Sequence, residues 1–157
     1  MGQVQNQIEA LSRAGSAARS LGNLRQALLF QETALELARK ARDPKWVAVT
    51  LTELAKSHAL NRQYEAALDY AAQAGEIVQA SSHLRPLAPF LANDLGTIHA
   101  MQGRFPEALR AFQDSARQAQ AGEQTELLVR ATLNGARAAI RLGHYAQATT
   151  GLREAGS

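Results

Sequence analysis

The sequence predicts an all-α solenoid of about four antiparallel helix pairs, and two observations carry this prediction. First, a large apolar residue followed three positions later by alanine recurs with a period of about 40 residues, and a fixed period of this size is typical of repeat proteins. Second, the 157 residues are 46% hydrophobic but only 5% aromatic, with four prolines, a composition that favours helices. The four copies of the motif are Leu24 with Ala27, Tyr64 with Ala67, Phe105 with Ala108, and Tyr145 with Ala148.

The first two pairs are expected at residues 4–41 and 44–80. In the first pair, apolar residues recur at helical spacing on either side of a break at residues 21–23. Asp43 is a favoured N-cap residue and Pro44 suits the first turn of a helix, so the second pair is expected to begin there. Its helices are expected at residues 45–60 and 64–79.

The third and fourth pairs are expected at residues 87–120 and 125–155. A looser connector, residues 81–86, separates the third pair from the second and ends in a proline. The helices of the third pair are expected at residues 87–102 and 105–120. The fourth pair is expected to turn near residue 143 and to end with a short helix.

One position of the repeat is small in every copy. A small residue on the first helix, opposite the alanine of the motif on the second, lets two helices approach closely. The large apolar residue of the motif then fills the space beside them. The four small residues are Gly15, Ala55, Gly96 and Ala136.

The run from Leu95 and Gly96 through Gly103, Phe105 and Ala108 to Phe112 resembles a tetratricopeptide repeat, and the resemblance covers nearly the whole chain. Tetratricopeptide repeats usually have a period of about 34 residues, so each helix here is expected to be about one turn longer. The pattern resembles the long-period branch found in kinesin light chains and in bacterial transcription regulators such as the maltose activator. This resemblance implies a right-handed superhelical solenoid, with residues 1–157 as a single repeat domain, complete or part of a longer protein.

Composition excludes several classes of function. The chain has no cysteine and no apolar run long enough to cross a membrane, and its N-terminus lacks a signal-peptide core. A cytoplasmic protein without membrane partners is therefore expected. The formal net charge is only +3, from 17 basic and 14 acidic residues, so charge alone does not favour nucleic acid as a partner.

Histidine offers the first test for a chemical site. His58 and His99 lie one repeat period apart and so occupy equivalent repeat positions. A metal or pH-switching pair is one interpretation, but the resemblance places this position between the two helices of a repeat, where a ring fills space. No serine has a histidine or aspartate placed to activate it, and no glycine-rich phosphate loop is present. We therefore expect no metal, no cofactor and no enzymatic activity.

The resemblance also implies that the first helix of each pair lines a concave groove that binds a peptide. Arg130, Arg137 and Arg141 share one side of a helix, and arginine binds carboxylates bidentately. These three predict an anchor for an acidic peptide, and Asn93 is expected to bond the peptide backbone. The alternative is an ordinary solvated basic face. The groove residues expected to bind the partner are Arg19, Lys56, Phe90, Asn93, Thr97, Arg130, Arg137 and Arg141.

The sequence therefore predicts a scaffold that binds a protein or peptide in this groove, and the arginines favour an acidic one. The alternative is a regulatory or oligomerisation segment of a larger bacterial signalling or transcription regulator. Self-association is a further expectation, because the ends of the repeat array lack obvious polar caps. A helical repeat that binds RNA is least favoured, since basic residues and aromatics do not form a continuous stripe.

Overall fold

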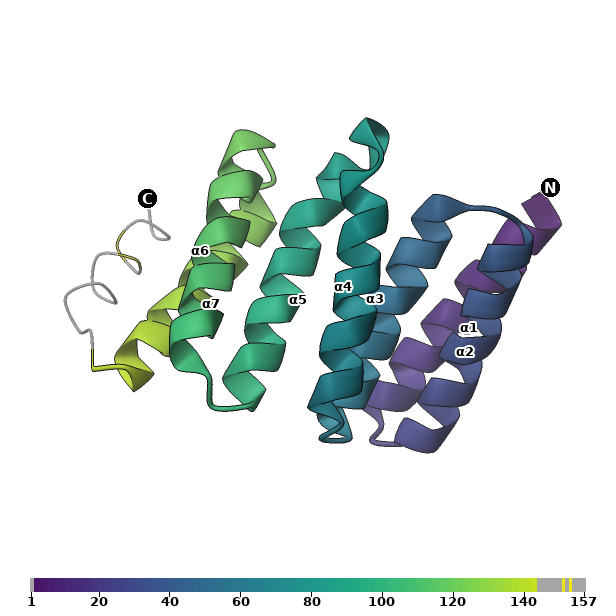
Figure 1. Ribbon diagram of the computed structural model, residues 1–157, viewed down its shortest axis with the longest axis horizontal. Coiled ribbons are helices and arrows are strands. Elements are labelled where there is room, and N and C mark those ends of the chain that lie inside the picture. Colours follow the sequence, from purple (N-terminus) through teal and green to yellow (C-terminus); the bar gives the residue numbers. More distant parts are fainter. Residues whose placement is uncertain (1, 144–150, 152, 154–157) are drawn as a thin grey trace. The chain divides into compact units, whose positions relative to one another are not determined.

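The computed structural model describes residues 2–143, 151 and 153, and these residues form helices joined by short turns, with no strand (Figure 1). The predicted all-α fold of antiparallel helix pairs is confirmed. The second helix expected in the fourth pair, with Tyr145 and Ala148, lies outside the described residues. The elements are α1 (Gly2–Ser20), α2 (Leu24–Lys40), α3 (Pro44–Leu60), α4 (Tyr64–Gln79), the 3-10 helix η1 (Ser82–Leu87), α5 (Ala88–Met101), α6 (Phe105–Ala121) and α7 (Thr125–Arg141).

Local signals set the helix ends. Asp43 caps α3 by accepting a hydrogen bond from the backbone N–H of Trp46 at 3.2 Å, and Pro44 opens the helix, as the sequence predicts. Asn23 caps α2 in the same way through Gln26, also at 3.2 Å. These caps satisfy backbone donors that a helix start leaves without partners.

The connector before the third pair is more ordered than expected. Residues Ser82–Leu87 form a 3-10 helix, and Leu84 within it is only 2% exposed. The sequence pattern missed this element because its six residues are too few to show a helical period, and Pro86 indicates only that an α-helix is interrupted.

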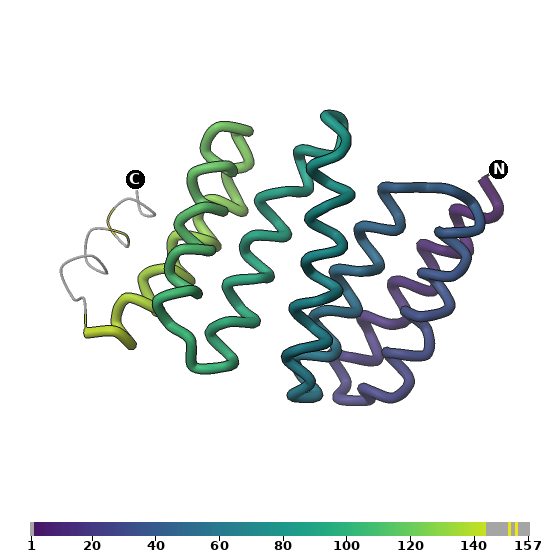
Figure 2. Tube along the Cα trace, in the orientation of Figure 1, coloured from purple at the N-terminus to yellow at the C-terminus, as the bar shows by residue number. Residues whose placement is uncertain are grey.

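The chain forms two compact units, Met1–Ser82 and His83–Ser157, here called the first unit and the second unit. Within each unit, every helix packs against the next one in the chain, and the first helices of successive pairs also touch (Figure 2). We call the surface formed by these first helices, α1 with α3 or α5 with α7, the first-helix face. That the chain is a single domain stays a prediction.

The two units repeat each other in register. Helices α2 and α6 both have 17 residues and begin at Leu24 and Phe105, and α3 and α7 both have 17 and begin at Pro44 and Thr125. Both starts are displaced by the same interval (105 − 24 and 125 − 44), which is 81 positions. A residue of the first unit can accordingly be compared with the one 81 positions later in the second.

The turn inside each pair needs a left-handed residue at one position. Gly22, Gly103 and Gly143 have φ values of 82°, 77° and 78° there, and Arg62 takes the same position in the second pair with φ 60°. Glycine adopts this conformation without the steric cost that a side chain imposes. Arg62 therefore holds a strained position that the other pairs give to glycine.

The predicted close approach of paired helices is confirmed at two of the small residues. A Cβ added to Gly96 would lie 2.6 Å from ring atoms of Phe112, and one added to Gly15 would lie 2.7 Å from Cγ of Gln31. Both partners are buried on the second helix of the pair. A glycine on one helix thus makes room for a large side chain on its neighbour, which fills the core between them.

Candidate functional site

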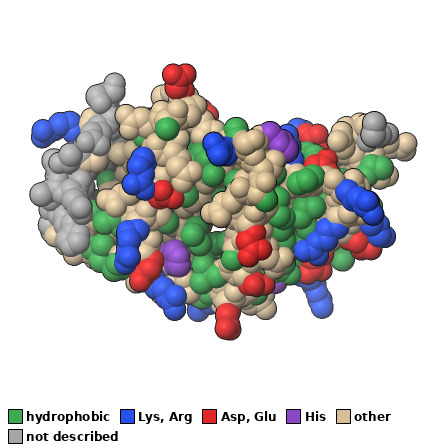
Figure 3. Space-filling model, turned by 45° about the horizontal axis from the view of Figure 1, so that its top comes forward, with side chains coloured by type: hydrophobic (Ala, Val, Ile, Leu, Met, Phe, Trp, Pro, Cys, Tyr) green, Lys and Arg blue, Asp and Glu red, His purple; other side chains and the backbone are tan. Residues whose placement is uncertain are grey.

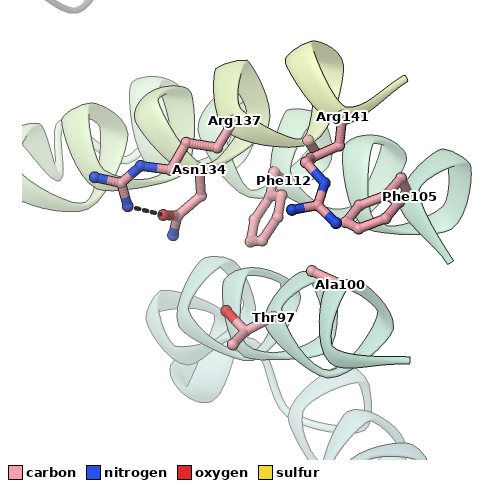
Figure 4. A pocket seen from close by; sticks show the side chains of 8 residues that line it. Thr97, Ala100, Phe105, Phe112, Asn134, Arg137 and Arg141 are labelled. Carbon is pink, nitrogen blue, oxygen red and sulfur yellow. Dashed lines mark hydrogen bonds between the residues drawn. The ribbon is translucent and has the colours of Figure 1, made fainter. Parts of the chain in front are cut away.

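An open pocket of about 170 Å³ lies on the first-helix face of the second unit (Figure 4). Helix α5 forms one wall, α7 forms the opposite wall, and α6 contributes aromatic rings between them. Three of the residues expected in the groove, Thr97, Arg137 and Arg141, line this pocket. Its other lining residues are Ala100, Phe105, Phe112, Asn134 and Ala138.

The base of the pocket is apolar and its rim is polar. Phe112 is only 3% exposed and packs with Ala138, while Ala100 packs against the same cluster. Phe105, at the start of α6, extends this surface toward the end of α7. An apolar base with a few polar groups at the rim is the usual composition of a binding site.

Two guanidinium groups stand at the rim. The Arg141 guanidinium carbon lies 4.9 Å from the centre of the Phe105 ring, a cation–π contact that holds the charge beside the pocket. The Arg137 Nη1 donates to Asn134 Oδ1 over a long 3.5 Å. Within the described part of the chain, neither arginine forms an ion pair with a carboxylate, so the rim keeps a positive charge.

An amide pair joins the two walls. Asn134 Nδ2 on α7 donates to Asn93 Oδ1 on α5 at 3.1 Å, and Asn93 is only 6% exposed. The side-chain oxygen of Asn93 therefore holds Asn134 in place. The bond from Asn93 to a peptide backbone stays a prediction.

The same face of the first unit is closed by an ion-pair cluster. Glu53 on α3 accepts from Ser16 Oγ at 2.8 Å and pairs with Arg19 Nη1 at 2.9 Å and Lys56 Nζ at 3.0 Å. Burial raises the pKa of Glu53, but Lys56, Arg19 and the hydrogen bonds outweigh it and hold the pKa below its usual value. Arg19 and Lys56, both expected in the groove, thus serve this cluster.

The remaining two expected residues lie away from the pocket. Phe90, near the start of α5, is 43% exposed, and Arg130 is exposed on α7. Sequence reasoning did not select Phe105, Phe112, Asn134 or Ala138 as groove residues. The repeat register could have pointed to Asn134, because this residue occupies in the second unit the position that Glu53 has in the first.

His58, the first of the two histidines at equivalent repeat positions, packs between helices. The ring of His58 stacks on Tyr70 of α4 with 5.1 Å between centroids, and its Nδ1 lies 2.7 Å from Gln63 Oε1. These contacts agree with a ring that fills space between α3 and α4. Among the described residues, no three histidine, cysteine or acidic side chains gather in a way that could hold a metal ion.

The distribution of charge and the hydropathy of the helices bear on binding to nucleic acid and to membranes. On the face drawn in Figure 3, basic and acidic side chains are interspersed rather than sorted into a continuous basic stripe. None of the helices in the described ranges combines the length and apolar character needed to cross a bilayer.

Family models and solved structures resemble this chain. Models described as tetratricopeptide repeat match residues 6–80 and 91–117. No curated protein matches the sequence at a significant level.

Among solved structures, BtubC (BKLC) from P. vanneervenii is 19% identical with a TM-score of 0.76 over 95% of this chain and 61% of its own. The chain thus spans less than two thirds of that protein. MamA is 17% identical with a TM-score of 0.66, covering 96% and 77%. A Podosopora anserina putative kinesin light chain with nearly identical TPR-like repeats is 16% identical with a TM-score of 0.69, covering 94% and 72%.

Proposed function

Because the chain belongs to the tetratricopeptide repeat family, we propose that it is a protein-interaction scaffold whose second unit binds an acidic segment of a partner. The tetratricopeptide repeat fold generally mediates protein–protein interaction, and scaffolds of this family are typically not enzymes. Our proposal adds the surface, which is the first-helix face of α5 and α7, and the chemistry of the segment. We also propose that the chain is not an enzyme and is located in the cytoplasm.

The observation that carries this proposal is the pair of arginines beside the apolar pocket. Arg137 and Arg141 form no ion pair within the described residues, and Arg141 is held against Phe105. A guanidinium fixed beside an apolar surface binds a carboxylate with less loss of side-chain freedom than a free one does. The arrangement therefore favours a peptide that offers a carboxylate and an apolar side chain together.

Binding of labelled peptides tests the proposal directly. Fluorescence anisotropy is measured with short end-capped peptides carrying glutamate and leucine in a glycine-serine background, and with the same peptides carrying glutamine. We expect the acidic peptides to bind more tightly and to weaken as salt is added. Replacing Arg137 and Arg141 by glutamate is expected to weaken binding at least about tenfold, because a charged hydrogen bond is lost and a like charge gained.

A matched control separates the pocket from net charge. Arg25 and Arg110 are both on second helices, outside the first-helix face, and changing both to glutamate alters the net charge by the same amount. Binding should then stay within about threefold of the unmodified protein. Equal losses in both double variants, or no preference for glutamate over glutamine, would refute the proposed site. A concentration-dependent mass with no peptide binding would instead support the self-association alternative.

A further inference from the structure

The two units carry matching hydrogen-bond donors around one point of the first-helix face, but among the residues that the structure describes a carboxylate is bonded to these donors in the first unit alone. In the register that relates the two units, three positions of the first correspond to three of the second. These pairs are Ser16 with Thr97, Glu53 with Asn134, and Lys56 with Arg137.

The first unit shows how such donors bind a carboxylate. The Glu53 carboxylate accepts a hydrogen bond from the Ser16 hydroxyl at 2.8 Å. It also pairs with the Arg19 guanidinium at 2.9 Å and with the Lys56 ammonium at 3.0 Å. The Arg19 and Glu53 side chains are only 15% and 16% exposed. An ionised carboxylate is stable at this depth because it is paired and hydrogen-bonded.

The second unit keeps the donors and replaces the acid by a neutral amide. Arg137 occupies the position of Lys56, and Thr97 that of Ser16. The guanidinium that Arg19 supplies from α1 in the first unit has its counterpart in Arg141, which lies on α7 rather than on α5, the helix equivalent to α1. Thr97 Oγ1 now donates to the carbonyl of Asn93 at 3.1 Å, so it must rotate to reach a ligand. None of the described residues that line the pocket with Thr97, Arg137 and Arg141 is acidic, so the lining supplies no charged acceptor for these three donors.

A second substitution leaves space beside these donors. Arg19 extends from α1 to Glu53 in the first unit, whereas Ala100 occupies the equivalent position of the second. Because the side chain of Ala100 is short, the pocket reaches Phe105 and the largely buried Phe112, which form its base. The cavity of about 170 Å³ is suited to one apolar side chain.

We propose that the pocket binds a glutamate side chain of a partner peptide in the way the first unit binds its own Glu53, with an adjoining apolar residue against Phe105 and Phe112. Arg137, Arg141 and Thr97 supply the donors for the ligand carboxylate. This inference rests on the proposed function and narrows it from an acidic segment to a single glutamate beside an apolar residue. The first unit, in which Glu53 and Arg19 are already paired, is a closed copy of the site.

The first test makes the second unit supply its own carboxylate. Asn134→Glu restores the acid found at Glu53, and Asn134→Gln is the neutral control of equal size. We expect the melting temperature of the glutamate variant to exceed that of the glutamine variant by about 2–4 °C, because two unpaired cations gain a partner. The difference should vanish when Arg137 and Arg141 are both changed to methionine. This readout needs no peptide.

The second test measures peptide binding by the same variants. The probe is an end-capped glycine-serine peptide containing one glutamate followed by leucine. Asn134→Glu is expected to bind this peptide at least about tenfold more weakly than Asn134→Gln does, because the glutamate of the first variant occupies the donors internally. Changing the peptide glutamate to glutamine should have a similarly large effect, and changing its leucine to alanine a smaller one.

The outcomes separate this inference from the proposed function. If acidic peptides bind but Asn134→Glu is no more stable than Asn134→Gln and binds them equally well, the glutamate inference is overturned and the proposed function stands. If no peptide binds the unmodified protein, the proposed function is overturned and the ligand assignment with it. Tighter binding of a phosphoserine peptide than of the glutamate peptide also overturns the choice of a carboxylate.

Discussion

The two units have equivalent backbone positions on their first-helix faces but carry different side chains there. In the first unit, Glu53 binds Arg19 and Lys56, and the contact joins α1 to α3. In the second unit, the contact between α5 and α7 is the neutral amide pair of Asn93 and Asn134. Two exchanges, alanine for arginine and asparagine for glutamate, therefore separate a structural ion pair from an open pocket. A charged side chain without an ion pair in one unit therefore indicates a binding group when the equivalent side chain of the other unit is paired.

The units also differ inside their helix pairs. Gly96 faces the aromatic ring of Phe112, while Gly15 faces the amide-bearing chain of Gln31, whose Oε1 accepts a hydrogen bond from Ser57 at 2.7 Å. The second unit therefore places a ring where the first places a polar chain. That ring is also part of the pocket base, so packing and binding are linked in the second unit.

The largest expected effect comes from closing the space at Gly96. Gly96→Ala puts a Cβ 2.6 Å from the Phe112 ring, and we expect the free energy of unfolding to fall by about 1–3 kcal/mol. Chemical denaturation measures it. Gly135→Ala is the matched control, because its Cβ would meet Phe112 Cβ at an ordinary 3.5 Å. That variant should be neutral or more stable by up to about 1 kcal/mol, since alanine favours a helix. An equal loss in both variants would contradict the packing account.

Breaking the ion-pair cluster of the first unit is expected to have an effect of similar size. Glu53→Gln removes the charge shared by Arg19, Lys56 and the Ser16 hydroxyl, and should lower the free energy of unfolding by about 1–3 kcal/mol. Asp114→Asn, which breaks an exposed pair with Arg117, should have little effect. If both changes had the same small effect, the cluster would contribute no more than a surface pair.

The same cluster predicts a pH dependence. The pKa of Glu53 is lowered in the folded protein from its ordinary 4.5, so its stabilisation is fully present above that pH and is lost as pH falls through the folded pKa. The stability difference between the unmodified protein and Glu53→Gln should therefore be constant near neutrality and shrink below about pH 4.5. Urea denaturation at a series of pH values measures it. A difference that grows on acidification would contradict the sign.

The smallest effect is at the turns. Arg62 has φ 60° at the position where the second unit has Gly143. Arg62→Gly should raise the free energy of unfolding by about 0.5–1 kcal/mol by relieving the left-handed strain. Gly103→Ala, at the same turn position in the next pair, should lower it by a similar amount, with no contribution from clashes because its surroundings are open. The same sign for both changes would show that turn conformation does not decide them.

Much of the fold could be predicted because its causes are local. The apolar spacing of α4 and the cap at Asp43 place those helices to within a residue, and the small residue at Gly96 predicts the close approach to α6. The 3-10 helix at Ser82–Leu87 could not be predicted, since its six residues are too few to show a helical period.

The site could be predicted only in part. Thr97, Arg137 and Arg141 follow from the repeat register, and they do meet at one pocket. The pairing of Arg19 with Glu53 joins residues 34 positions apart and depends on how α1 packs on α3, so spacing within one helix cannot show it. The roles of Asn93 and Asn134 depend on a contact between α5 and α7 for the same reason.

The most direct test is an NMR titration that follows the arginine side chains. Nε–Hε resonances of Arg19, Arg137 and Arg141 are assigned from single arginine-to-lysine variants, and the glutamate–leucine peptide is then added. We expect the resonances of Arg137 and Arg141 to shift with saturation while that of Arg19, already paired with Glu53, stays in place. Shifts at Arg19 with none at Arg137 and Arg141 would contradict the account of one open and one closed copy of the site.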